Sequence, residues 1–115
     1  MRAGAVPAAR LRIETALGEL IAFAPKGRVA LGARVMLGIR PEQVRVIPPG
    51  ASRPAHNCVP ARVVESCFLG DSSEHRVESG GREFRMQSVP PRLELPAEVS
   101  LYLDPDELVV LRDVE

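Results

Sequence analysis

The chain has 115 residues, with 15 basic and 15 acidic side chains and only 3% aromatic residues. This length suffices for one small domain. The neutral balance and scarce rings argue against nucleic-acid binding, which typically uses a basic face with stacking aromatics. No apolar run reaches the roughly 18 residues that a membrane helix needs, so we expect no direct membrane insertion. Two cysteines, Cys58 and Cys67, are too few for a disulfide framework, and we expect free thiols in a cytoplasmic protein.

Short strands separated by proline and glycine are predicted along the whole chain. Leu11 and Ile13 alternate with charged residues, a turn follows at 16–18, and Gly80-Gly81 is typical of a tight hairpin turn. Many short strands between regular turns are typical of a small all-β barrel or sandwich. In chain order the predicted strands lie near 11–13, 19–24, 35–39, 44–47, 61–63, 75–79, 84–86, 99–103 and 108–111.

The most informative feature is an internal repeat. A shift of 64 positions places Val35 on Val99 and Pro41 on Pro105, with alternating apolar residues on both sides. The same shift places Arg12 on Arg76, Glu14 on Glu78, Glu19 on Glu83, Glu42 on Asp106 and Val44 on Leu108. Chance alternation would rarely match the charges and the proline corner as well. We therefore predict two tandem copies of one β unit.

The repeat also predicts the domain organisation. Repeat one covers 11–47, a proline-rich linker covers 48–56, and repeat two with its leading strand covers 57–111. The leading strand near Val59 has no counterpart in repeat one, because that position would lie before Met1. We expect the first copy to lack its N-terminal strand, with residues 1–10 a tail remnant of a preceding segment. Either the chain is part of a longer protein or another segment supplies the strand.

The stretch VMLGIRPEQVRVI breaks in its middle and changes its apolar parity. Repeat two has the same break at Leu103 to Asp106, with the proline and an acid but without the arginine. Because both copies carry it, we interpret the break as a corner, since proline removes a backbone donor and ends ladder pairing. Arg40 is not required by this geometry, and a surface ion pair is favoured over a partner contact.

Catalytic and metal sites are disfavoured. His56, Cys58, Cys67 and His75 do not form the two close pairs of a typical zinc site. No orienting group accompanies a Cys-His pair. A G-x-x-x-x-G-K-[ST] phosphate loop does not occur in the sequence. We predict no catalytic residue, no cofactor and no metal.

Three segments resemble the TOBE domain: LGIRPEQVRVI, NCVPARVVESCFLGDSSEHRVESGG and LPAEVSLYLDPDELVVL. The resemblance implies a small OB-like or MOP-like β-barrel over 11–115, and rests most on Gly38, Arg40, Pro41, Glu42, Gly70 and Asp71. It implies a non-catalytic regulatory and dimerisation module of an ABC importer's ATP-binding subunit, of the polyamine, iron and sugar group. The implied partners are the ATPase domain, the permease and a second copy. The implied location is cytoplasmic, peripheral at the inner membrane.

The alternative is a free-standing small-ligand or oxyanion binder, because domains of this architecture include molybdate binders. Lys26, Ser72, Ser73 and Arg76 are the candidate donors to such an anion. Serine and aspartate after glycine are also ordinary turn residues, and that structural interpretation is favoured. Calorimetry with oxyanions distinguishes the two.

Overall fold

The computed structural model describes residues 10–23, 35–92 and 94–112, and all of its regular structure is β except for one short turn of 3-10 helix. The predicted alternation and turns are confirmed as strands in the expected order. The elements are β1 Arg10–Thr15, β2 Gly18–Phe23, β3 Val35–Gly38, the 3-10 turn η2 Pro41–Gln43, β4 Val44–Ile47, β5 Cys58–Phe68, β6 Ser73–Ser79, β7 Arg82–Ser88, β8 Glu98–Leu103 and β9 Val109–Arg112.

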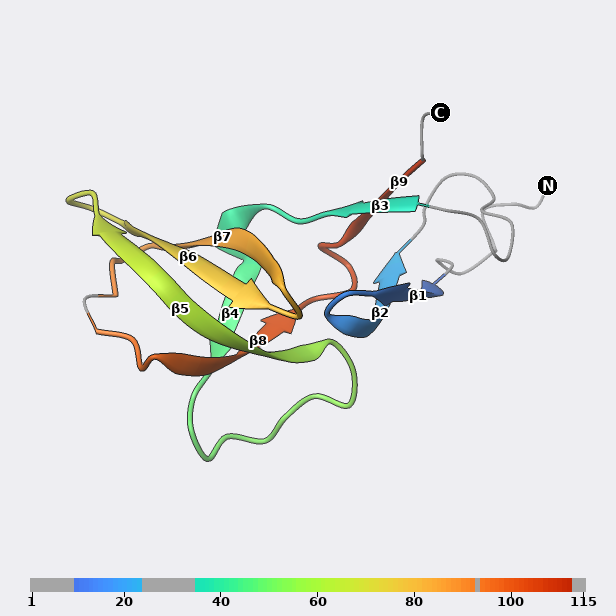
Figure 1. The fold of residues 1–115 in the computed structure, drawn as a ribbon, viewed down its shortest axis with the longest axis horizontal. Coiled ribbons are helices and arrows are strands. Elements are labelled where there is room, and N and C mark those ends of the chain that lie inside the picture. Colours follow the sequence, from blue (N-terminus) through green and yellow to red (C-terminus); the bar gives the residue numbers. More distant parts are fainter. Residues whose placement is uncertain (1–9, 24–34, 93, 113–115) are drawn as a thin grey trace.

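The strands form two sheets. The five-stranded sheet has the order β4-β8-β5-β6-β7 and curls into a half-barrel, with the turn of the long β5–β6 hairpin at the end far from the four-stranded sheet (Figure 1). The four-stranded sheet has the order β1-β2-β9-β3 and lies beside it (Figure 1). The backbone crosses from one sheet to the other at two corners. At the first corner β3 continues through η2 into β4, and at the second β8 continues through a turn into β9.

The strand pairs β3–β9 and β8–β4 have the same register under the 64-residue shift. The pairs in β3–β9 are Met36 with Leu111, Leu37 with Val110 and Gly38 with Val109, and those in β8–β4 are Ser100 with Ile47, Leu101 with Val46 and Tyr102 with Arg45. Each pair of the first set becomes a pair of the second set when one member is moved forward by 64 and the other back by 64.

The two corners also share a backbone hydrogen bond. The N–H of Gln43 donates to the carbonyl of Arg40 at 2.9 Å, and the N–H of Glu107 donates to the carbonyl of Asp104 at 2.9 Å. Both corners therefore close the same tight turn. The inward-facing positions change from odd-numbered to even-numbered residues across the first corner. Leu37 packs against the core before the corner, and Val44 is buried after it.

Both sheets contribute to the core, and most of its members come from the five-stranded sheet. It is built from inward-facing aliphatic side chains, because successive residues of a strand face opposite sides. Its buried members are Leu20, Ala22, Val44, Val59, Ala61, Val77, Met86, Leu101, Leu103 and Leu108.

Candidate functional site

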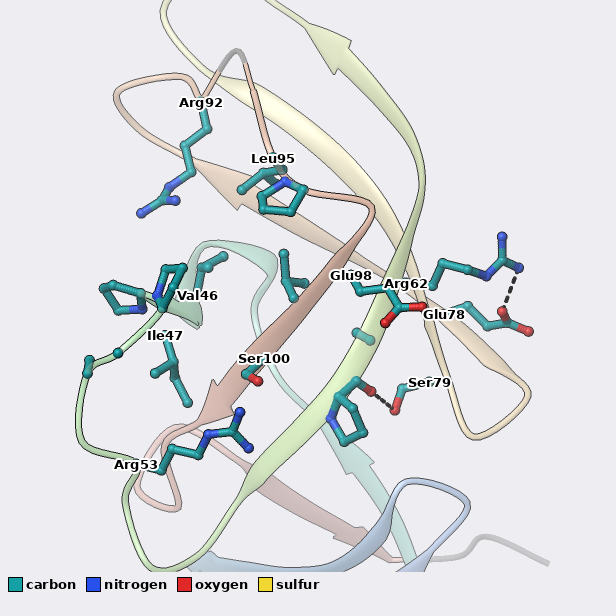
Figure 2. Close-up of a pocket in the computed structure, with 18 of the residues that line it drawn as sticks. Val46, Ile47, Arg53, Arg62, Glu78, Ser79, Arg92, Leu95, Glu98 and Ser100 are labelled. Atoms are coloured by element: carbon teal, nitrogen blue, oxygen red, sulfur yellow. Dashed lines mark hydrogen bonds and ion pairs between the residues drawn. The ribbon is translucent and has the colours of Figure 1, made fainter.

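The first candidate site is a groove under the linker, here called the linker groove. It has a volume of about 770 Å³ and opens between the linker, the ends of β4 and β8, and the middle of β5 (Figure 2). Its lining residues are Val46 to Ala51, Arg53, Pro60 to Arg62, Glu78 to Gly81, Arg92, Leu95, Pro96 and Glu98 to Ser100.

The polar groups of the linker groove are partly engaged with one another. Arg62 pairs with Glu78 at 2.7 Å, and the Ser79 hydroxyl donates to the carbonyl of Pro60 at 2.6 Å (Figure 2). Arg53 and Arg92 come from different segments and lie at opposite ends of the groove (Figure 2). Besides the Arg62–Glu78 pair, the groove carries the charges of Arg53, Arg92 and Glu98, and no nucleophile is paired with a base among its lining residues.

A second groove, here called the hairpin groove, has a volume of about 610 Å³ and lies between the β1–β2 turn, β3 and the start of β7. It is mostly apolar, with Leu17, Leu37 and Phe84 among its lining residues. Six of its residues have counterparts in the linker groove under the 64-residue shift, namely Glu14, Thr15, Ala16, Leu17, Val35 and Met36. The two grooves thus occupy equivalent places under this shift. Strand β5 lines the linker groove, and among the described strands the hairpin groove has no counterpart of it.

His75 forms the most buried polar cluster. Its side chain is 1% exposed, its Nδ1 lies 2.7 Å from the Ser66 hydroxyl, and its Nε2 lies 2.9 Å from the Ser73 hydroxyl. The Ser73 oxygen also accepts the backbone N–H of Arg92 at 2.9 Å. Burial, and secondarily the charge of Arg92, lowers the pKa of His75 from its usual 6.5. The imidazole is neutral at pH 7 and ties β5, β6 and the segment after β7 together.

The described oxyanion candidates Ser72, Ser73 and Arg76 do not line either groove. Ser72 and Ser73 are buried, and Ser73 already bonds His75 and the Arg92 backbone. Arg76 is on the outer face of β6, where its guanidinium pairs with Glu65 at 3.1 Å and Glu83 at 3.3 Å. Lys26 lies outside the described residues. Anion binding by this set therefore stays a prediction.

The motif residues of the two loops sit at turns. Gly38 ends β3, Pro41 begins η2, and Glu42 is exposed within that turn. Arg40 is exposed, and its side chain makes no capping hydrogen bond to η2. Gly70 has φ +97° at the β5–β6 turn, a conformation that glycine adopts readily, and the exposed Asp71 follows it. These positions bend the backbone.

Sequence reasoning missed Asn57. This residue is 4% exposed and has φ +64°, which asparagine tolerates better than most residues. Its side-chain oxygen accepts the N–H of Ile21 at 2.8 Å, and its amide nitrogen donates to the carbonyls of Ile21 at 2.8 Å and Leu103 at 2.6 Å. Asn57 therefore joins the two sheets. An asparagine directly before a predicted strand was the only available signal.

The two cysteines considered above as zinc ligands are not joined to each other. Cys58 and Cys67 are free thiols, and the Cys58 thiol donates to the carbonyl of Pro54 at 3.4 Å. Within residues 10–23, 35–92 and 94–112, no group of three or more His, Cys, Asp or Glu side chains is arranged to hold a metal ion. Over the same ranges, no helix has both the length and the apolar character needed to cross a bilayer.

Comparison with protein families gives one decisive match. The TOBE domain family model matches residues 37–111, from β3 to β9. The chain belongs to the TOBE domain family. TOBE domains are typical of the C-terminal regions of ABC transporter ATPases and of molybdate-binding proteins. No curated protein matches the chain.

Proposed function

We propose that this TOBE domain is a non-catalytic regulatory and dimerisation module of an ABC transporter ATP-binding protein involved in solute import. The family match over residues 37–111 carries the proposal, because such domains typically form the C-terminal regions of these ATPases. Its partners are the ATPase domain, the permease and a second copy. It acts at the cytoplasmic face of the inner membrane by shifting the population of the closed ATPase pair.

The hydrogen bonding of the buried polar side chains supports a structural role for the domain over ligand binding. Among the described residues, every buried side-chain nitrogen or oxygen has a hydrogen-bond partner. Asn57 and Ser73 are the clearest cases, since each bonds the protein's own backbone. Buried polar groups that hold the chain together in this way are not available to a ligand.

We also infer that the domain consists of two copies of one β unit, 11–47 and 57–111, joined by 48–56 into a single OB-like barrel over 11–115. The equal register of β3–β9 and β8–β4, together with the shared bond at both corners, supports this duplication. Strand β5 has no counterpart among the described strands of the first copy.

The alternative function is a free-standing oxyanion or small-ligand binder. The observation that favours it is the pair of arginines, Arg53 and Arg92, that line the linker groove. An oxyanion bound there would accept hydrogen bonds from both guanidinium groups.

Calorimetry with molybdate, tungstate, sulfate and phosphate separates the two functions. The module predicts heats no larger than dilution, with Arg53→Ala behaving like the unchanged chain. Stoichiometric binding that Arg53→Ala abolishes would establish the alternative.

The importer assignment is tested by expressing the chain with the ABC subunits encoded beside its gene and purifying through the permease. We expect the chain to copurify, and its consistent loss from the purified complex would contradict the assignment.

A further inference from the structure

Strand β1 presents an open edge with opposite charges. It ends the four-stranded sheet, and among the described strands only β2 pairs with it. Arg12 and Glu14 are both on its exposed face, separated by the inward-facing Ile13. Unpaired strand edges are templates for another strand, so the identity of the missing neighbour matters.

The backbone groups at this edge can be assigned. Ile21 lies opposite Arg12, and both its N–H and its C=O are bonded to the Asn57 side chain rather than to β1. Arg12 and Ile21 are therefore a non-hydrogen-bonded pair, and the alternation of an antiparallel ladder follows from it. The N–H and C=O groups of Arg12 and Glu14 point away from β2 toward the open edge.

The other half of the molecule shows which strand fits such an edge. Under the 64-residue shift β1 corresponds to β6, whose outer neighbour is β5. The register places Arg62 opposite Glu78, Val63 opposite Val77 and Glu65 opposite Arg76. Both oppositely charged pairs form ion pairs, at 2.7 Å for Arg62 with Glu78 and 3.1 Å for Glu65 with Arg76.

Transferred to β1, this pattern specifies the neighbour. Glu14 corresponds to Glu78, Ile13 to Val77 and Arg12 to Arg76, so the neighbour needs a base, an apolar residue and an acid in that order. β1 carries this order itself, since it reads Arg12, Ile13, Glu14. An antiparallel copy of β1 would therefore present to β1 the charges that β5 presents to β6.

We propose that two copies of this chain pair antiparallel through β1, with Ile13 of one copy opposite Ile13 of the other. The inference rests on the proposed dimer and names its edge. Each Arg12 then lies opposite the partner's Glu14, and this ion pair occurs twice because the interface is isologous. The backbone is compatible with this register, because the outward-pointing N–H and C=O groups of Arg12 lie opposite those of the partner's Glu14. Two four-stranded sheets become one continuous sheet.

Charge balance favours a second copy over an unrelated strand. Glu14 lies directly opposite Glu19 on β2, and like charges opposite each other destabilise a sheet. The equivalent acids of the second half, Glu78 and Glu83, are also opposite each other, but Arg62 and Arg76 neutralise them. In the proposed pairing, the partner's Arg12 places a positive charge beside Glu14, as Arg62 does beside Glu78.

Charge reversal with measurement of molar mass tests the proposal. Sedimentation or light scattering of the full chain at micromolar concentration should give a dimer. Arg12→Glu and Glu14→Arg should each weaken the dimer by at least about tenfold, because each brings like charges together twice. The double variant should recover the dimer, since it restores opposite charges in reversed order. An equimolar mixture of the two single variants should form a heterodimer. Arg76→Glu on β6 is the matched control and should stay dimeric.

The outcomes separate this edge from the proposed function. A dimer that both single variants leave unchanged overturns pairing through β1 and keeps the dimeric module. A monomer at all accessible concentrations overturns both the edge and the proposed dimer. Single variants that dissociate while neither the double variant nor the mixture reassociates also overturn the register around Ile13. Circular dichroism of each variant confirms that it is folded before its mass is interpreted.

Discussion

The backbone of Gly80 lies against the main-chain carbonyl of Ala16, so closely that a Cβ atom on Gly80 would overlap the carbonyl oxygen and lie 2.7 Å from the carbonyl carbon. Ala16 and Gly80 are 64 residues apart and occupy the same place in the β1–β2 and β6–β7 turns. The two hairpins therefore touch at residues that are equivalent under the 64-residue shift.

Gly80→Ala should destabilise the protein by about 2–4 kcal/mol. The new methyl group meets backbone atoms of Ala16, which cannot move aside as a flexible side chain does, and φ +60° adds strain. Gly81→Ala is the matched control, because Gly81 has φ +80° but open space around it, and it should cost about 1 kcal/mol. Urea denaturation measures both. Equal losses for the two variants would show that the contact between the turns is not tight.

Asn57→Asp should lower the free energy of unfolding by about 2–4 kcal/mol. The substitution keeps the shape but removes the amide donor, so the carbonyls of Ile21 and Leu103 lose their partner and face a carboxylate. His56→Ala, at the exposed neighbouring position, is the control and should change stability by less than about 0.5 kcal/mol. If Asn57→Asp were equally mild, Asn57 would not be holding the sheets together.

The strands and corners could be predicted because their signals are local. Period-two alternation marks β6 and β8, Gly80-Gly81 marks a turn, and Pro41 and Pro105 mark the corners within a few residues of sequence. The repeat added the correspondence of the two corners, which have the same bond from Gln43 to Arg40 and from Glu107 to Asp104.

The polar clusters could not be predicted because their partners are far apart in sequence or depend on register. Asn57 bonds residues 36 and 46 positions away, and no pattern near it indicates those distances. His75 was expected to fill a strand position, which is confirmed, but its bond to Ser66 depends on a register shift within β5. Ser73 has the composition of an anion donor, and only burial shows that its hydroxyl is already used.

The two corners give a paired prediction, because equivalent positions carry different residues. The Asp104 carboxylate accepts the N–H of Asp106 at 2.9 Å, whereas Arg40 makes no capping bond. Asp104→Ala should therefore cost about 1 kcal/mol, as for loss of a turn or cap acceptor, and Asp104→Asn should cost less. Arg40→Ala should be neutral within about 0.5 kcal/mol. A larger loss for Arg40→Ala than for Asp104→Ala in thermal melts would contradict the purely geometric role of the first corner.

Stability should fall in mild acid because of His75. Burial lowers its pKa in the folded state below the usual 6.5, so the unfolded chain binds the proton more readily. The stabilisation is therefore complete above about pH 6.5 and is lost progressively as the pH falls toward the lowered folded-state pKa. Urea denaturation between about pH 7.5 and pH 5 should show a decreasing free energy of unfolding across this window.

His75→Gln is the variant that isolates this effect, since glutamine retains polar atoms near Ser66 and Ser73 but has no proton to bind in this range. It should be less stable than the unchanged chain at pH 7.5, because one of the two hydrogen bonds made by the imidazole nitrogens is lost. This difference in stability should shrink toward pH 5. His56→Gln should keep the full pH dependence, because His56 is exposed in the linker. A pH dependence that persists in full in His75→Gln would contradict its assignment to His75. The unchanged chain and the two variants have the same carboxylates, so any contribution from these groups is common to all three proteins.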